Sequence, residues 1–119
     1  MGRFIASDIV LVHFPFDDLS ASKLRPGLVL AESRPNSYLV AAVTSQEKRK
    51  IQGAIEITKA HLSEGKLNRT SYIRPDVLFT AHDSIVERRV GRLQAETHST
   101  IIEAIHRHMI DHAPKDSKG

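Results

Sequence analysis

The stretch SDIVLVHFPF, residues 7–16, decides the fold that this sequence is expected to adopt. Its middle is apolar and rich in β-branched residues, which is typical of a strand covered on both faces. A first strand is therefore predicted from Asp8 to Phe14. Similar segments follow at short intervals, and further strands are predicted in GLVLAE (27–32), YLVAAVT (38–44), AIEI (54–57), TSYI (70–73) and SIVERRVGRL (84–93).

Two segments do not follow the strand pattern. TKAHLSEGKLN, residues 58–68, is predicted to be a short helical turn or loop that ends near Gly65. After residue 93 the apolar spacing changes to three and four residues, which predicts a one-sided helix over 96–113 with Thr97 or Ser99 as its N-cap. The apolar side of this helix would be formed by Ile101, Ile102, Ile105 and Met109.

The order of these elements favours a mainly β fold. Several short strands followed by one helix predict a small, strongly bent antiparallel sheet or β-barrel with a C-terminal α-helix laid over it. Residues 1–112 are predicted to form this single domain, and residues 113–119 a flexible tail. The strands at 27–32 and 38–44 carry more apolar residues than one barrel interior can use, and this surplus predicts a two-fold interface with a second copy.

Composition excludes several classes of function. The 119 residues include no Cys, which excludes a disulfide scaffold and a thiolate metal site and suggests a cytoplasmic location. No apolar segment is long enough for a signal peptide or a membrane span, so no membrane partner is expected. The net charge of +3 favours polyanionic partners only weakly. Of the seven histidines, His108 and His112 can share a helical face, but no third ligand is indicated and no metal site is predicted.

The segment TSYIRPDVLFT, residues 70–80, places Arg74 and Asp76 two residues apart among apolar neighbours. On an extended chain such residues point to the same face. One interpretation is a structural ion pair, worth about 0–1 kcal/mol. The other is acid–base chemistry on a phosphodiester, in which a carboxylate takes the proton of the 2′-hydroxyl and a cation stabilises the phosphorane. Since the pKa of arginine is normally above about 12, Arg74 suits the electrostatic role better than that of an acid.

Two further motifs carry groups that suit a phosphate. In LRPGLVL, residues 24–30, Pro26 restricts the conformation of Arg25 and would orient it at the rim of the sheet. Thr44 and Ser45 stand where a strand enters the basic loop QEKRK, residues 46–50. Their hydroxyl and amide groups would bind a phosphate or cap a turn, and the basic run would meet a phosphate backbone or form a solvated face.

These motifs occur in one order along the chain. SDIVLVHFPF, LRPGLVL, VTSQ, SYIRPDVLFT and VGRL, followed by a last helix, resemble the MazF/PemK family of toxins from type II toxin–antitoxin systems, over residues 8–109. The resemblance implies an SH3-like barrel, the plasmid maintenance toxin fold shared with CcdB. It implies a homodimer that binds a cognate antitoxin, and that meets DNA only through this antitoxin. It also implies a sequence-specific endoribonuclease, independent of metals and cofactors, that cleaves single-stranded RNA, chiefly mRNA.

The resemblance also implies roles for particular residues. In the PemK branch the chemistry is assigned to an Arg-x-Asp pair, which here is Arg74 and Asp76, with Asp76 as base and Arg74 as acid or phosphate stabiliser. In the MazF branch a loop arginine and a strand-end threonine matter most, and Arg25 and Thr44 match those. Contacts to RNA are expected from Lys23, Ser45, Gln46, Lys48 and Arg49.

The sequence departs from the family pattern at three places. Ser7 stands where the first motif usually begins with Gly. The loop DDLSASK, residues 17–23, lacks the histidine that members often carry there, which leaves the acid–base assignment and the RNA sequence preference open. Pro75 removes a backbone donor within the Arg-x-Asp pair, so its strand is expected to end there or to lie at an edge of the sheet.

Two alternatives stay open at the level of sequence. A CcdB-like toxin would bind DNA gyrase without cleaving RNA, but such proteins end in Trp-Gly-Ile, whereas this chain has no Trp and ends in DSKG. An inactive relative that only binds RNA or the antitoxin is the second alternative, because a retained motif does not prove activity.

Overall fold

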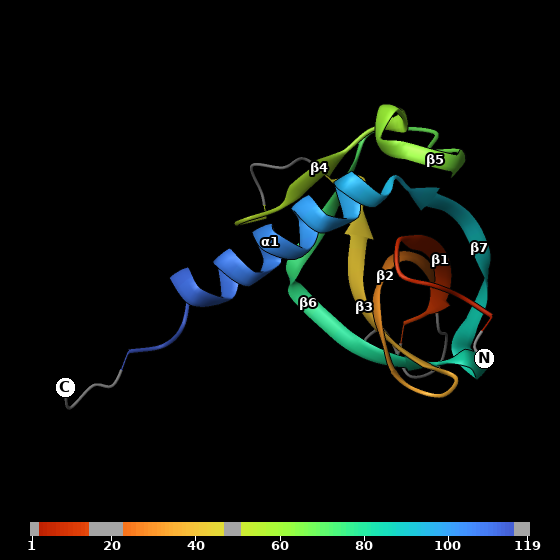
Figure 1. Ribbon diagram of the computed structural model, residues 1–119, viewed down its shortest axis with the longest axis horizontal. Coiled ribbons are helices and arrows are strands. Elements are labelled where there is room, and N and C mark those ends of the chain that lie inside the picture. Colours follow the sequence, from red (N-terminus) through yellow and green to blue (C-terminus); the bar gives the residue numbers. More distant parts are fainter. Residues whose placement is uncertain (1–2, 15–22, 47–50, 116–119) are drawn as a thin grey trace.

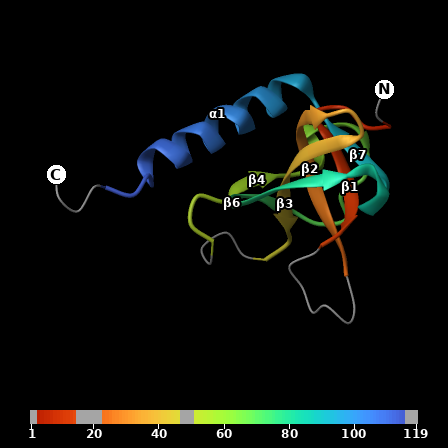
Figure 2. The same cartoon turned by 90° about the horizontal axis from the view of Figure 1, so that it is seen from below.

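The computed structural model describes residues 3–14, 23–46 and 51–115. Seven strands within these ranges form one antiparallel sheet in the order β4-β6-β3-β2-β1-β7-β5. The sheet curls on itself, and α1 lies along its outside (Figures 1 and 2). The elements are β1 (Asp8–His13), β2 (Leu24–Arg34), β3 (Ser37–Thr44), β4 (Ile55–Ile57), β5 (Leu62–Gly65), β6 (Ser71–His82), β7 (Val86–Leu93) and α1 (Ala95–Asp111). The predicted mainly β fold with a C-terminal helix is therefore confirmed.

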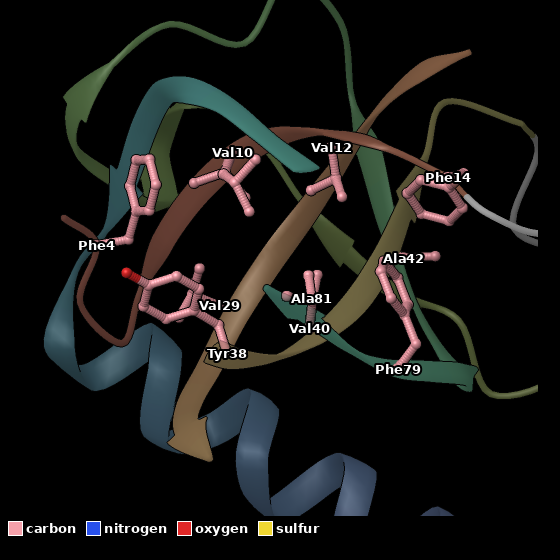
Figure 3. Packing of buried hydrophobic residues seen from close by; sticks show 11 residues of the cluster. Phe4, Val10, Val12, Phe14, Val29, Tyr38, Val40, Ala42, Phe79 and Ala81 are labelled. Atoms are coloured by element: carbon pink, nitrogen blue, oxygen red, sulfur yellow. The ribbon is translucent and has the colours of Figure 1, made fainter. Parts of the chain in front are cut away.

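The inner face of the sheet encloses an apolar core (Figure 3). Alternate residues of the strands point into it, and they are fully or almost fully buried. Two edge-to-face ring pairs close its ends: Phe14 lies 4.8 Å from Phe79, and Phe4 lies 5.6 Å from Tyr38, between ring centroids. The core contains Phe4, Val10, Val12, Phe14, Val29, Tyr38, Val40, Ala42, Phe79, Ala81 and Val86.

The outer face carries a second core beneath α1. Leu28 and Ala41, which alternate with the inner residues of their strands, pack in one cluster with Ile101 and Ile105 of the helix. The surplus of apolar residues that predicted an interface with a second copy is thus largely buried by the chain's own helix. The apolar residues of α1 that do not pack on the sheet stay exposed, including Met109, which is 50% exposed.

The start of α1 differs from the prediction. Neither Thr97 nor Ser99 is the N-cap; this position is held by Gln94, whose side chain makes no capping hydrogen bond. Instead, the backbone N–H of Gln94 donates to the carbonyl of His61 at 2.9 Å, and its side-chain amide donates to two further carbonyls of that segment. Tertiary contacts therefore fix the first residue of the helix, and local capping chemistry does not. Within the described ranges, no helix is both long and apolar enough to cross a membrane.

The segment 58–68 is only partly the loop that was predicted. It begins with a 3-10 turn (Lys59–His61), but β5 follows and pairs with β7. Gly65, which was predicted to end a helical turn, instead ends this strand with φ +84°, and a side chain there would collide with the backbone of Val90 and Gly91. This strand joins the sheet because the backbones of two glycines approach each other closely. Such a contact cannot be predicted from the sequence of either segment alone.

The first strand is anchored by a buried charge. Asp8 is 1% exposed, and its carboxylate accepts hydrogen bonds from Nε of Arg92 at 2.7 Å and from the backbone of Ile5 at 2.9 Å. Ser7, directly before it, has φ 87°, and its backbone bonds both Val29 and Leu93. The position usually occupied by Gly in the family motif thus has a backbone conformation that favours Gly.

Candidate active site

A cavity of about 470 Å³ opens where the start of β2, the end of β3 and the start of β6 meet. Residues 24–26 and 42–46 contribute to its wall, together with Asn68, Arg69, Ser71 and Arg74. Of the predicted site residues, the cavity brings together Arg25, Thr44, Ser45, Gln46 and Arg74. These residues are up to 49 positions apart in the sequence, so it is the pairing of β2, β3 and β6 that gathers them.

Two described residues that were predicted for the site, Asp76 and Lys23, do not line this cavity. Asp76 is linked to it only through Arg74, and Lys23 lies beside β2 outside the lining. Lys48 and Arg49 lie outside the described residues, as do Asp17 to Ser22 of the loop that lacks a histidine and residues 116–119 of the predicted tail.

Arg74 and Asp76 belong to a bulge in β6. The ladder between β3 and β6 pairs Val43 with Ile73 and Ala41 with Leu78, so four residues of β6 oppose a single residue of β3. Pro75 therefore interrupts no ladder bond, and the strand continues to His82. The prediction of a strand end or an edge strand was wrong, because β6 lies between β3 and β4 and the bulge accommodates the missing donor.

The bulge is packed from behind. Pro75 is buried, and the turn at Gly53 fits between it and the ring of His108 on α1. A Cβ on Gly53 would lie 2.5 Å from Nδ1 of His108 and 3.3 Å from Cγ of Pro75, and its φ is +77°. The ring of His108 in turn stacks on His112 with 4.2 Å between centroids. These contacts support the bulge through Pro75, and neither Gly53 nor His108 lines the cavity.

Within the bulge the two charged side chains form a fork-to-fork pair. Nε of Arg74 donates to Oδ1 of Asp76 at 3.1 Å, and Nη2 donates to Oδ2 at 2.6 Å. These hydrogen bonds hold the pKa of the Asp76 carboxyl below its ordinary value against the effect of burial. The same bonds raise the pKa of the Arg74 guanidinium. As paired here, Arg74 is a poor acid and Asp76 is a weak, fully ionised base.

The remaining predicted residues are positioned by their strands. Arg25 pairs with Val12 in the register of β1 and β2, and is exposed at the start of β2. Gly27, two residues on, passes so close to β3 that a Cβ would lie 2.5 Å from Cγ1 of Val40. Thr44 ends β3, and its Oγ1 accepts the backbone N–H of Gln46 at 3.1 Å. The hydroxyl of Thr44 thus both caps the turn and keeps its own proton to donate into the cavity.

Sequence reasoning missed part of the wall. Asn68, Arg69 and Ser71 line the cavity from the segment that leads into β6. Ser71 is buried, and its hydroxyl donates to the carbonyl of Arg69 at 3.1 Å, which fixes the turn. The stretch LNRTS at 67–71 is rich in polar residues that could bind a ligand. Its own sequence, however, does not indicate that it packs near the ends of β2 and β3. Three arginines and no carboxylate line the described wall, which suits an anionic ligand.

A metal centre is not formed by these side chains. In the ranges that the structure describes, no three His, Asp or Glu side chains are grouped so as to hold a metal ion. The chemistry of the described site is that of guanidinium, hydroxyl and amide groups.

The curled sheet with a C-terminal helix and its arginine-lined cavity fit the class of protein that the sequence resembles, and the comparison with protein families agrees. A family model described as the PemK-like, MazF-like toxin of type II toxin–antitoxin systems matches residues 6–109. The chain therefore belongs to the PemK/MazF toxin family. No curated protein sequence matches it.

Solved structures share the fold. The Mycobacterium tuberculosis toxin MazF-mt6 is 24% identical, with a TM-score of 0.63, over 84% of this chain and 93% of its own. MazF from Deinococcus radiodurans is 19% identical, with a TM-score of 0.64, over 88% and 94%. A mycobacterial endoribonuclease in complex with its cognate antitoxin is 12% identical, with a TM-score of 0.65, over 98% and 100%. At these identities the likeness shows the fold alone.

Proposed function

We propose that this chain is a metal-independent endoribonuclease that cleaves single-stranded RNA and is held inactive by a cognate antitoxin. The observation that carries the proposal is the cavity whose described lining includes Arg25, Arg74 and Thr44 and no carboxylate. Such a wall supplies positive charge and hydroxyl donors to a phosphodiester, which are the groups that phosphorane formation needs. Membership in the toxin family supports the same function.

In the proposed reaction the 2′-oxygen of the RNA attacks the adjacent phosphorus, and the bond to the 5′-oxygen breaks. Asp76 accepts the proton of the 2′-hydroxyl, and the leaving 5′-oxygen takes a proton from a water molecule. The hydroxide that remains takes the proton from Asp76, which regenerates the carboxylate. Arg25 and Arg74 stabilise the negative charge that develops on the phosphorane, while Thr44 donates a hydrogen bond to it. The products are a 2′,3′-cyclic phosphate and a free 5′-hydroxyl.

The Arg74–Asp76 pair suits this sequence of events. A phosphate competes with the carboxylate for the same guanidinium fork, because both accept two parallel hydrogen bonds. When Arg74 turns to the phosphate, the bonds that lower the pKa of Asp76 weaken, and the carboxylate becomes a stronger base. The base would thus be activated by the binding of its own substrate.

The partners follow from the same site. We propose a cytoplasmic homodimer in which two copies of the cavity are available to one RNA, and an antitoxin whose acidic, partly disordered segment occupies the cationic wall. DNA is contacted only through the antitoxin. Antitoxin inhibition should weaken as salt rises, because the attraction between exposed charges is screened.

The decisive experiment is incubation of the purified protein with a long single-stranded RNA in EDTA, followed by mapping of the ends. Cuts at defined sequences that leave 2′,3′-cyclic phosphates are expected. Cleavage that EDTA abolishes and Mg²⁺ restores would overturn the metal-independent mechanism, and an intact RNA would overturn the proposed activity.

A further inference from the structure

A second cavity adjoins the first and has no place in the cleavage step. It measures about 320 Å³ and is lined by Thr58, Lys59, Leu67, Asn68, Arg69 and Thr70. Asn68 and Arg69 line both cavities, so the two hollows meet at these residues. The result is one continuous track that leads from Arg25 past Arg69 to Lys59.

Arg69 is an exposed arginine that lines both cavities. Arg3, Arg74, Arg89 and Arg92 each bond a carboxylate. In the described ranges no carboxylate lies within ion-pair distance of Arg69, although its side chain lines both cavities. An exposed guanidinium directed into a hollow and left without a counter-charge is suited to a phosphate.

The other end of the track carries a second cation. Lys59 is exposed in the 3-10 turn that precedes β5, and it also has no carboxylate partner in the part of the chain that the structure describes. Leu67 adds an apolar side chain to the same lining. A hollow that combines two cationic side chains with an apolar one suits the phosphates and the sugar or base of a nucleic-acid strand.

We propose that this second cavity is a binding subsite for single-stranded RNA next to the cleaved bond, in which Arg69 and Lys59 each contact a backbone phosphate. The inference rests on the proposed function, since the first cavity must hold the scissile phosphate for the track to continue from it. It assigns to residues 58–70 a part in holding the RNA and no part in the chemistry.

The test uses the full-length protein and an uncleavable probe, a fluorescein-labelled, mixed-sequence single-stranded RNA in which every 2′-hydroxyl is methylated. Arg69→Gln and Lys59→Gln each remove one phosphate contact, so each should weaken binding about fivefold at 0.1 M salt and reduce the slope of log K against log salt by about 0.7. Arg88→Gln is the matched control, because Arg88 is exposed on β7, lines neither cavity and alters the net charge equally.

The outcomes separate this inference from the proposed function. If the wild type binds the probe, and Arg69→Gln and Lys59→Gln bind it with the same affinity and the same salt slope, the subsite is overturned. The proposed cleavage site is not affected by that result. A wild type that neither binds the probe nor cuts RNA would overturn both. If the two variants weaken binding of polyglutamate and not of RNA, the cavity accepts an acidic polypeptide, and the inference is wrong.

Discussion

The guanidinium of Arg74 and the carboxylate of Asp76 share two hydrogen bonds, although their side chains are 34% and 40% exposed. Water competes for both groups at such a position, so the pair contributes little to stability, about 0–1 kcal/mol. Its geometry is better explained by the bulge, which places the fork beside the cavity and leaves it accessible to an incoming phosphate.

Replacing Asp76 by Asn should abolish most cleavage without unfolding the protein. The change is nearly isosteric and removes the proposed base, so turnover should fall on the order of 100- to 10,000-fold. Cleavage rates at saturating RNA and urea unfolding curves are the measurements. Asp83→Asn is the control, because it breaks an ion pair with Arg3 of similar length, 3.0 Å, whose residues do not line the cavity. An Asp76→Asn enzyme with normal turnover would remove Asp76 from the mechanism.

Ser7→Gly is expected to stabilise the protein. The strain of a left-handed Ser is of the order of 1–3 kcal/mol, and the added freedom of Gly in the unfolded chain offsets about 0.4–1 kcal/mol of the gain. A net increase of about 1 kcal/mol in the free energy of unfolding should appear in urea titration. Asn36→Gly is the matched comparison, since Asn36 also has a positive φ, 64°. Asn tolerates that region, so the comparison variant should gain less. Equal gains would show that Ser7 is not strained.

Two carboxylates bind the same guanidinium of Arg92 and should differ in their effect. Asp8 is 1% exposed in its side chain and Glu64 is 50% exposed. Asp8→Asn leaves hydrogen-bonding groups without a charged partner inside the protein, which should lower the free energy of unfolding by about 1–3 kcal/mol. Glu64→Gln should change it by less than about 1 kcal/mol. Equal effects in thermal unfolding would show that burial does not set the strength of this anchor.

The proposed dimer is expected to use the apolar edge of α1 that the sheet leaves uncovered. A groove of about 360 Å³ runs there between the helix and the sheet, and Ile102 and Met109 line it. Ile102→Glu places a charge in the groove and should produce monomers of half the mass in sedimentation at micromolar protein. Ile110→Glu is the control, because Ile110 is 52% exposed and does not line the groove. A dimer that survives Ile102→Glu would place the interface elsewhere.

Stability should fall in mild acid because of His98. Burial lowers the pKa of His98, against a smaller opposing effect of a hydrogen bond to the backbone of Leu30, and its Nδ1 has no partner among the described residues. The unfolded chain therefore binds a proton first as the pH falls through about 6.5. The contribution of neutral His98 to the free energy of unfolding is fully present above that pH. It is lost as the pH falls from there toward the lowered pKa of the folded state.

The measurement is the urea midpoint near pH 7.5 and near pH 5.5, two sides of the histidine range. His98→Gln keeps a side-chain donor and removes the titration, so its midpoint should fall less than that of the wild type. The comparison between the two proteins removes the effect of the other six histidines. An identical loss in both would exclude His98 as the cause.

The strands of this fold could be predicted because their apolar residues recur locally, and the candidate site because its motifs occur in a familiar order. The features that escaped prediction are non-local. β5 exists because Gly65 approaches Gly91, and the bulge at Arg74 is defined only by its register against β3. Arg69 escaped for the same reason, since nothing in its own segment shows which strands it will face.

The bulge also determines where this chain tolerates change. Residues 74–77 oppose a single residue of β3, so a shorter or longer segment there is absorbed without moving Leu78 out of register. A one-residue insertion in 78–82 would instead turn every following side chain of the strand to the opposite face. Descendants of this sequence can therefore vary the length of the bulge as long as Arg74 and Asp76 are kept, while the segment from 78 to 82 must keep its exact number of residues.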